Sequence, residues 1–419
     1  MGTSNVVLLS IGGHPGLSAL PLGTFFLGAS LVSLRVTPWH FQQWGRKVGF
    51  LVGVAIGLLG TCLGIVAVLY HSPPLLIVAT AAFGAAMGIG FYLRFAAIEV
   101  VPSHWADKAV TLVVSGGCIA AFAGPESAQG TRGIFGEEYE YLGVFVMTGI
   151  FNIANGVFTA MVRFPAADRK TNPSENDSQS TTIHDSFDKE ERWDRVKSIL
   201  KSRNFMVPML ISAGSWIIMV LPMSILRVAM ADAGFTSRQS LLTIELHFLC
   251  MYGPGFFSGQ WIARYGPRLV SVAGVSISLI SFACLQLAGS ANSTSNAEGT
   301  ELLLWILGMA LIGIGWNFSF SAGTVGSTRS YTSRKDCKSA IQAANDGVTF
   351  LLTGAVICSA SYIYQAGGKG LAGWRVVNWV DLGFMVVFSI LLGVDLWVER
   401  RHSSGATTSV DSWASPSIQ

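Results

Sequence analysis

The chain has 419 residues, of which 51% are hydrophobic and only 12% charged, and its mean hydropathy is +0.51. A soluble globular domain carries about 25% charged residues, so the composition excludes that class and indicates many membrane spans. The net charge of +3 excludes little, because in a membrane protein the position of each charge matters more than the sum. The six cysteines are scattered without a CxxC pair, which argues against a disulfide framework or a zinc site.

The first apolar run extends from Asn5 to Gly13. It is too short to cross a hydrocarbon core of about 30 Å. No Lys or Arg precedes it, so it lacks the basic start of a signal peptide. We expect the run to be the outer half of a first transmembrane helix whose beginning is missing. The alternative is a short buried plug.

Longer apolar runs follow, and each is long enough to cross a membrane as a helix. They lie at 17–37, 48–70, 75–101, 107–127, 141–163, 205–230, 240–263, 267–288, 302–325, 339–364 and 376–398. The sequence therefore predicts an all-α polytopic membrane protein with about 11 full spans and a partial first helix. Its expected parts are an N-terminal bundle (1–163), a charged linker (164–203), a six-helix C-terminal bundle (204–401) and a disordered tail (402–419).

The linker from Phe164 to Arg203 carries eight basic and eight acidic residues in 40 positions. Trp193, Val196 and Leu200 recur in it at helical spacing, which predicts an amphipathic helix on the inner membrane face. Placing the linker in the cytoplasm puts 21 of the 27 Lys and Arg residues on that side, as the positive-inside rule requires. A possible glycosylation site, Asn292-Ser293-Thr294, then lies outside. We expect the linker and the C-terminus to be cytoplasmic, in the plasma membrane or an organelle membrane.

Two loops between spans share a pattern of glycine and basic residues. The second reads GQWIARYGPR from Gly259 to Arg268, and the first reads WGRKVGF from Trp44 to Phe50. They resemble the loops between helices 2 and 3 and between helices 8 and 9 of the major facilitator superfamily, whose pattern is G-x-x-x-D-x-x-G-R-K. The matching residues are Gly45, Arg46 and Lys47 in the first loop and Gly259, Arg264, Gly266 and Arg268 in the second. The acidic position holds Ala263 or Gln42, which puts latching by that group in doubt.

Other stretches look like the same superfamily, in a poorly characterised and largely bacterial branch. They are SGGCIAAFAGP (115–125), FYLRFAAIEVVP (91–102), LHFLCMYGPGFFSG (246–259), GIGWNFSF (313–320) and QAANDG (342–347). The resemblance implies a 6+6 fold of two pseudo-symmetric bundles and secondary transport by alternating access. It also implies that helices 1, 4, 7 and 10 line a central cavity. That nominates Tyr92, Arg94, Trp216, Met219, Met223, Trp316 and Asn317 as solute-facing or gating residues.

Charged side chains inside predicted spans are expensive to insert, at about 2.5 kcal/mol or more each. Arg94 and Asp346 fall at a similar depth in the two halves, so we predict that they pair and close an inner gate. Two alternatives remain open: a structural pair of Arg94 with Glu99, or binding of an anionic solute by Arg94. Glu245 and His247 are each a candidate carrier of a coupled proton, although about 200° separates them on one helix.

Enzyme chemistry finds no support, because the sequence has neither a G-x-x-x-x-G-K-[ST] loop nor an H-E-x-x-H helix. We expect no catalytic residue, cofactor, metal or nucleic-acid partner, and we expect a monomer in a lipid bilayer. The predicted function is secondary active transport of a small amphipathic or aromatic organic solute, with protons as a candidate coupling ion. The alternatives are a non-transporting receptor on the same scaffold and an inactive truncated transporter.

Overall fold

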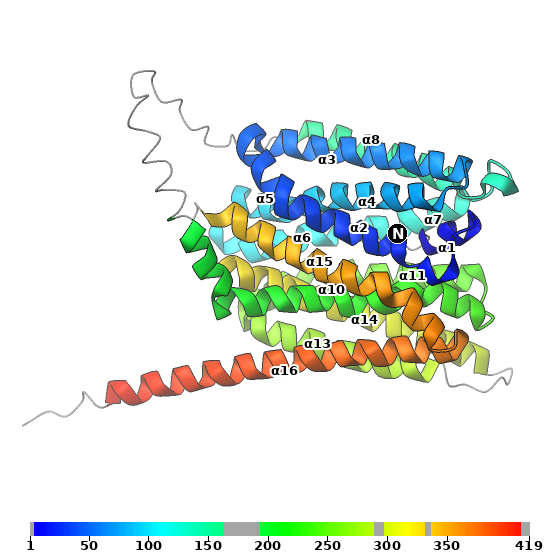
Figure 1. Cartoon of the computed structure of the whole chain (residues 1–419). Coiled ribbons are helices and arrows are strands. Elements are labelled where there is room, and N and C mark those ends of the chain that lie inside the picture. Colours follow the sequence, from blue (N-terminus) through cyan, green and yellow to red (C-terminus); the bar gives the residue numbers. More distant parts are fainter. Residues whose placement is uncertain (1–3, 163–190, 192, 289–296, 332–336, 412–419) are drawn as a thin grey trace, which may run out of the picture.

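A computed structural model describes residues 4–162, 191, 193–288, 297–331 and 337–411, and the regular elements in these ranges are all helices. Ten of the described helices are long and apolar enough to cross a membrane. They lie side by side in one bundle (Figure 1). The linker helix (residues 193–201) lies at one end of the bundle, which we call the linker end, and we call the opposite end the far end. The predicted all-α polytopic fold is confirmed.

The first half of the bundle precedes the linker. Its helices are α1 (Ser4–Ser10), α2 (Leu20–Leu31) with the π-helical turn η2 (Val32–Val36), α3 (Thr37–Leu69), α4 (Pro73–Gly90), α5 (Leu93–Val100), α6 (Ala106–Ser115), α7 (Gly117–Gly130) and α8 (Leu142–Met161). The single-turn 3₁₀ helices η1 (Pro15–Leu17), η3 (Ser103–Trp105) and η4 (Glu137–Tyr139) connect them. The pairs α4/α5 and α6/α7 are each one predicted span with a short break.

The second half follows the linker. It contains α10 (Arg203–Asp232), α11 (Ser237–Tyr252), α12 (Gly255–Tyr265), α13 (Pro267–Ala288), α14 (Ala297–Arg329), α15 (Lys338–Ala366) and α16 (Gly370–Asp411). The predicted span 240–263 is divided between α11 and α12, because a proline at 254 has no N–H for a helical hydrogen bond. Ten stretches therefore qualify as spans while the sequence predicts eleven long runs, because the run at 240–263 is divided between α11 and α12.

The two halves repeat the same packing. In the first half α3 packs against α4 and α8, and in the second half α13 packs against α14 and α16. The loops with the shared glycine pattern also match in their backbone. Gly45 has φ 76° and ψ 170°, and Gly266 has φ 82° and ψ 158°, a left-handed region that favours glycine. Pseudo-symmetry of the two halves therefore extends from helix packing to single backbone angles.

The centre of each half differs. In the second half α10 packs against α11, α14, α15 and α16, and 94% of its most apolar 18-residue window is buried. The corresponding neighbours in the first half are α2, α4, α7 and α8. Among the described residues, no full-length helix stands between them; that place is taken by the short helix α1 and a cavity of about 610 Å³.

The halves meet along two seams. The first seam joins α2 to α15, and the second joins α6 to α12 and α7 to α11. The second seam is tight because a Cβ added at Gly117 would lie 2.5 Å from the Tyr252 ring. The absence of a side chain at Gly117 thus allows α7 and α11 to approach closely.

Two predicted segments differ from the structure. Val196 and Ile199 of the linker helix are buried against Phe205 and Ile341 at the ends of α10 and α15, while Trp193 is exposed. The helix thus packs on the protein through the face predicted to lie on the membrane. The helix α16 extends to Asp411, past the start at 402 of the tail that the sequence predicts to be disordered. The rest of the tail, residues 164–190 of the linker and the 292–294 site lie outside the described residues.

Candidate functional cavity

Two adjoining cavities occupy the middle of the bundle. The larger, of about 610 Å³, is enclosed by α1 to α8 and touches the second half at Tyr252 and Trp316. The smaller, of about 380 Å³, lies between α4, α7 and α8 of the first half and α10 and α11 of the second. Met87, Phe91 and Thr148 belong to the walls of both. The two volumes therefore form one central space that both halves line.

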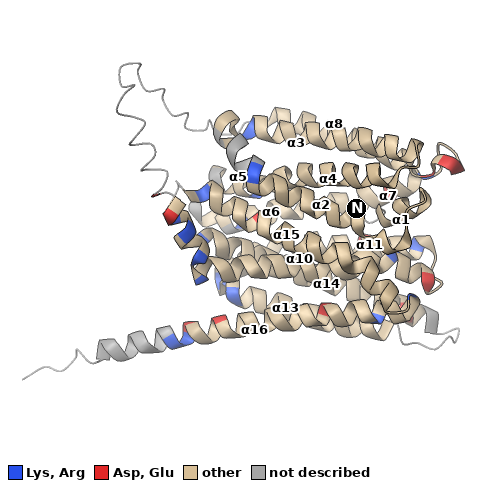
Figure 2. Ribbon diagram, in the orientation of Figure 1, with Lys and Arg blue, Asp and Glu red and all other residues tan. Residues whose placement is uncertain are grey.

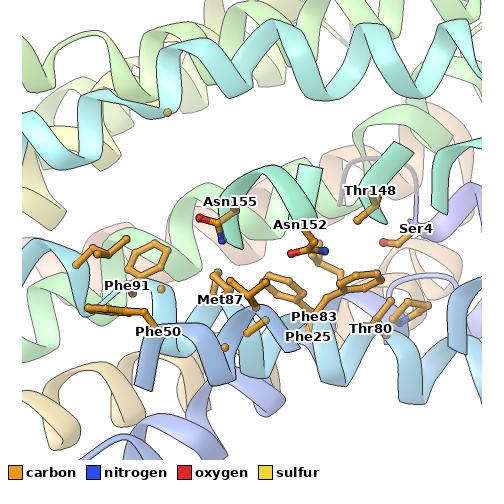
Figure 3. Close-up of a pocket in the computed structure, with 18 of the residues that line it drawn as sticks. Ser4, Phe25, Phe50, Thr80, Phe83, Met87, Phe91, Thr148, Asn152 and Asn155 are labelled. Carbon is orange, nitrogen blue, oxygen red and sulfur yellow. The ribbon is translucent and has the colours of Figure 1, made fainter. Parts of the chain in front are cut away.

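The larger cavity has a polar side and an apolar side. Thr148, Asn152 and Asn155 project from α8 on one side, and Phe25 and Phe83 face them from α2 and α4 (Figure 3). The three polar residues recur at spacings of four and three, which places them on one face of α8. The Asn152 carboxamide lines the cavity, where its donor and acceptor can reach a bound molecule.

A cluster of aromatic rings crosses from one half to the other beside these cavities. Phe91 at the end of α4 lies 5.8 Å from Trp216 of α10 and 5.5 Å from Phe350 of α15. Trp216 packs edge-on to Trp316 of α14 at 5.1 Å, and Trp316 stacks on Phe320 at 4.8 Å. These are ring-centroid distances in the range that favours aromatic pairs.

Both tryptophans offer a polar group as well as a ring. The indole N–H groups of Trp216 and Trp316 are buried and have no hydrogen-bond partner among the described residues. Trp216 lines the smaller cavity and Trp316 the larger. A buried N–H without a partner is destabilising unless a bound molecule or water accepts from it.

Toward the linker end, Arg94 of α5 pairs with Asp346 of α15. Both side chains are 2% exposed, and Arg94 also lines the larger cavity. Asn345 donates to the same Asp346 oxygen at 2.9 Å. The Arg94 guanidinium carbon lies 4.6 Å from the Phe95 ring centroid and 4.9 Å from that of Phe320. A salt bridge thus joins the two halves at the floor of the cavity, and it is held in an aromatic frame.

The predicted pairing of Arg94 with Asp346 is therefore present. The side chain of Glu99, the alternative partner, lies outside the described residues. Within the described part of the chain, two Arg94 nitrogens, Nε and Nη1, and one Asp346 oxygen have no hydrogen-bond partner. A solute that reaches Arg94 would find unused donors there, so gating and anion binding both stay predictions.

At the far end, a second salt bridge joins the halves. Arg238, at the start of α11, donates to Glu126 of α7 at 2.6 Å. Glu245 lies on the same face of α11 as Arg238, with an oxygen 4.0 Å from the guanidinium. His247 instead faces α14, where its ring nitrogen Nδ1 lies 2.7 Å from the Met309 carbonyl oxygen. Figure 2 shows acidic and basic residues gathered at both ends of the bundle.

At the linker end of the second half, Asp395 of α16 accepts from Arg203 and from Arg268, each at 2.6 Å. Arg268 also pairs with Glu399. Arg268 belongs to the shared glycine-basic loop, which lacks its acidic residue at Ala263. Asp395 of α16 therefore supplies the carboxylate partner of Arg268 that the loop itself lacks.

Not every predicted residue reaches the central space. Trp216, Met219, Met223, Trp316 and Arg94 line it. Five others do not line it. Tyr92 donates to the Ser33 carbonyl at 3.4 Å, and Asn317 donates to the Met251 carbonyl at 2.8 Å. Asp346, Glu245 and His247 have the positions described above. The remaining motif residues lie outside the central space: Gly45, Arg46 and Lys47 at the kink within α3, Gly259 and Arg264 in α12, and Gly266 at the end of α12.

The sequence did not predict Asn152, Asn155, Tyr252 or Asp395. A signal for the asparagines exists, because two carboxamides three residues apart in an apolar span must find polar partners on one face. Tyr252 lies in the stretch 246–259, directly before a Gly-Pro-Gly sequence. That stretch contains several other aromatic residues, so its pattern does not distinguish Tyr252.

Comparisons with known proteins agree with this architecture. The chain is 25% identical over 410 residues to the riboflavin transporter RfnT of Brucella anthropi, covering 96% of this chain and 94% of the relative. It is 26% identical over 316 residues to the uncharacterised transporter YddS of Bacillus subtilis, covering 74% and 69% of the two chains.

Solved structures with the same fold include two from Escherichia coli. The fucose:proton symporter FucP matches with a TM-score of 0.60 at 15% identity, covering 93% of this chain and 94% of that one. The xylose transporter XylE matches with a TM-score of 0.65 at 11% identity, covering 92% and 91%. The model of the Major Facilitator Superfamily matches residues 3–352. The chain therefore belongs to the Major Facilitator Superfamily.

Proposed function

We propose that the chain moves a small, flat heteroaromatic solute across a membrane by alternating access. The observation that carries this proposal is the composition of the central space, where aromatic rings lie opposite open hydrogen-bonding groups. A ring system can stack against the aromatic cluster, while carbonyl and N–H groups on its edge bind the Asn152 carboxamide and the indole N–H of Trp316.

The size of the space fits such a molecule. Cavities that bind small molecules have volumes of about 300–1,000 Å³, and the larger cavity, at about 610 Å³, falls in that range. The relative named as a riboflavin transporter supports the choice, because riboflavin carries a flat ring system with carbonyl and N–H groups at its edge.

Alternating access requires that the halves separate at one end while they stay closed at the other. The salt bridges Arg94–Asp346 and Glu126–Arg238 lie at opposite ends, and each joins the first half to the second. We propose that Arg94–Asp346 closes the linker end when the far end opens. The positive-inside rule supports a cytoplasmic linker end, because most Lys and Arg residues gather there (Figure 2).

Reconstituted protein tests the proposal. Liposomes that contain the chain should take up radiolabelled riboflavin in a saturable manner, and D-fucose should not compete. Asn152→Leu should reduce uptake at low riboflavin concentration. Phe158→Leu, on the exposed face of the same helix, is the matched control and should leave uptake unchanged. Uptake of fucose without uptake of riboflavin would refute the heteroaromatic class, and saturable riboflavin binding without flux would favour a receptor.

A further inference from the structure

The far-end salt bridge stands directly over the smaller cavity. One wall of that cavity is α7, with Gly124, Pro125 and Ser127, and the facing wall is α11, with Leu241 and Ile244. Glu126 and Arg238 project from these same two helices and bond to each other. When this bond forms, α7 and α11 are held together at the mouth of the cavity.

A third charged group makes the arrangement unbalanced. The Glu245 side chain is 3% exposed, points toward Arg238, and its Oε1 has no hydrogen-bond partner among the described residues. Arg238 and Glu245 are seven residues apart, so they lie on the same face of α11. Two carboxylates therefore compete for one guanidinium, and one of them is buried. A buried carboxylate without a full partner is costly while it is charged.

The other charged groups near α11 are engaged elsewhere. From α10, Arg227 donates to Ser237 at 3.2 Å. On the side that faces α14, His247 is held by the Met309 carbonyl. From α7, Glu126 lies within electrostatic reach of Glu245. Among the described residues, Arg238 is thus the cation placed to neutralise Glu245, and Arg238 is already bonded to Glu126.

We propose that Glu245 is a proton-binding site that controls closure of the far end. When Glu245 is charged, it draws Arg238 along α11 and away from Glu126, and the seam between α7 and α11 loosens. When Glu245 takes a proton from water at the far end, it releases Arg238, which then bonds Glu126 and closes the seam. Binding of a proton thereby becomes a signal to shut the mouth of the cavity. The inference deepens the proposed transport function and rests on it for its biological meaning.

Cysteine labelling tests the gate without any solute. Ser127 lines the smaller cavity below the bridge, and Gly130 is exposed at the end of α7. Single variants Ser127→Cys and Gly130→Cys, in lipid nanodiscs, are labelled with a charged maleimide at pH 8 and pH 5.5. Labelling of the unmodified chain is subtracted to remove the native cysteines. The readout is the labelling rate of Ser127→Cys divided by that of Gly130→Cys, because this ratio cancels the pH dependence of the thiol reaction itself.

We expect the ratio to fall about fivefold between pH 8 and pH 5.5, which is the largest change typical of an exposed ion pair. Glu245→Gln, which resembles the protonated side chain, should give the low ratio at both pH values. Glu126→Gln should give the high ratio at both. The matched control is Glu140→Gln, because Glu140 bonds Arg132 within one loop and does not join the halves; it should respond as the parent does.

The proposal is overturned if Glu245→Gln keeps the pH response of the parent, or if Glu140→Gln removes it. If Glu245→Gln does not fold, Arg238→Gln is tested in its place, and we expect the high labelling ratio at both pH values. An Arg238→Gln protein that keeps the parent's pH response would also refute the gate. A chain with the expected labelling but no riboflavin flux keeps the gate and refutes the proposed solute. Riboflavin flux without a Glu245-dependent change in labelling keeps the proposed solute and refutes the gate.

Discussion

Removing the carboxylate of Asp346 tests whether the salt bridge at the cavity floor is as important as its burial indicates. Both side chains are 2% exposed, so the pair belongs to the buried class, in which loss of one partner costs about 3–5 kcal/mol. Asp346→Asn leaves the Arg94 charge in place among the rings of Phe95 and Phe320. Those rings still attract the guanidinium, so we expect a loss at the lower limit, about 3 kcal/mol.

The assay is the midpoint of thermal unfolding in detergent, followed by tryptophan fluorescence. Replacing both partners with apolar residues, Arg94→Met with Asp346→Leu, should recover most of the stability, because no unpaired charge remains. The same double variant should lose transport if the bridge is a gate. Glu140→Gln, which breaks an exposed salt bridge, is the control and should cost less than about 1 kcal/mol. An Asp346→Asn protein that unfolds at the parent's midpoint would refute the reasoning.

Three further changes test other contacts. Trp216→Phe removes the indole N–H and one of the two fused rings, so riboflavin affinity in a fluorescence titration should weaken about fivefold, and the smaller buried side chain should also lower the unfolding midpoint. An unchanged affinity would show that the N–H does not bind solute. Gly117→Val places a side chain against the Tyr252 ring and should destabilise the protein by about 1–3 kcal/mol, and an unaltered midpoint would contradict the tight seam. Asp395→Asn leaves Arg203 and Arg268 without their shared carboxylate. We expect the unfolding midpoint to fall by an amount corresponding to about 2 kcal/mol. A loss no larger than that of Glu140→Gln would argue against the network.

The sequence predicts the helices well because each apolar run must satisfy its own backbone hydrogen bonds in lipid. It also predicts that Arg94 needs a partner, since the cost of an unpaired charge at that depth is large. Its partner Asp346 can be predicted because few other charged residues lie at that depth in the predicted spans.

Near the ends of the helices the partner of a charged residue cannot be predicted in this way, because many charged residues are available there. Glu126, Arg238 and Asp395 all lie there, and their partners depend on which helix ends are neighbours in the folded bundle. The break between α11 and α12 is a similar case, because a glycine-proline pair in an apolar run can either kink a helix or pass with little change. Asn317 was assigned to the cavity by its helix, yet its rotation about that helix turns it toward Met251.

The buried position of α10 has a mechanical consequence for the second half. A domain with a continuous helix along its axis resists shear, because every neighbouring helix is braced against it. In the second half α10 packs against α11, α14, α15 and α16, and 94% of its most apolar window is buried. When the two halves rock, the second half should therefore turn about α10 as one stiff block.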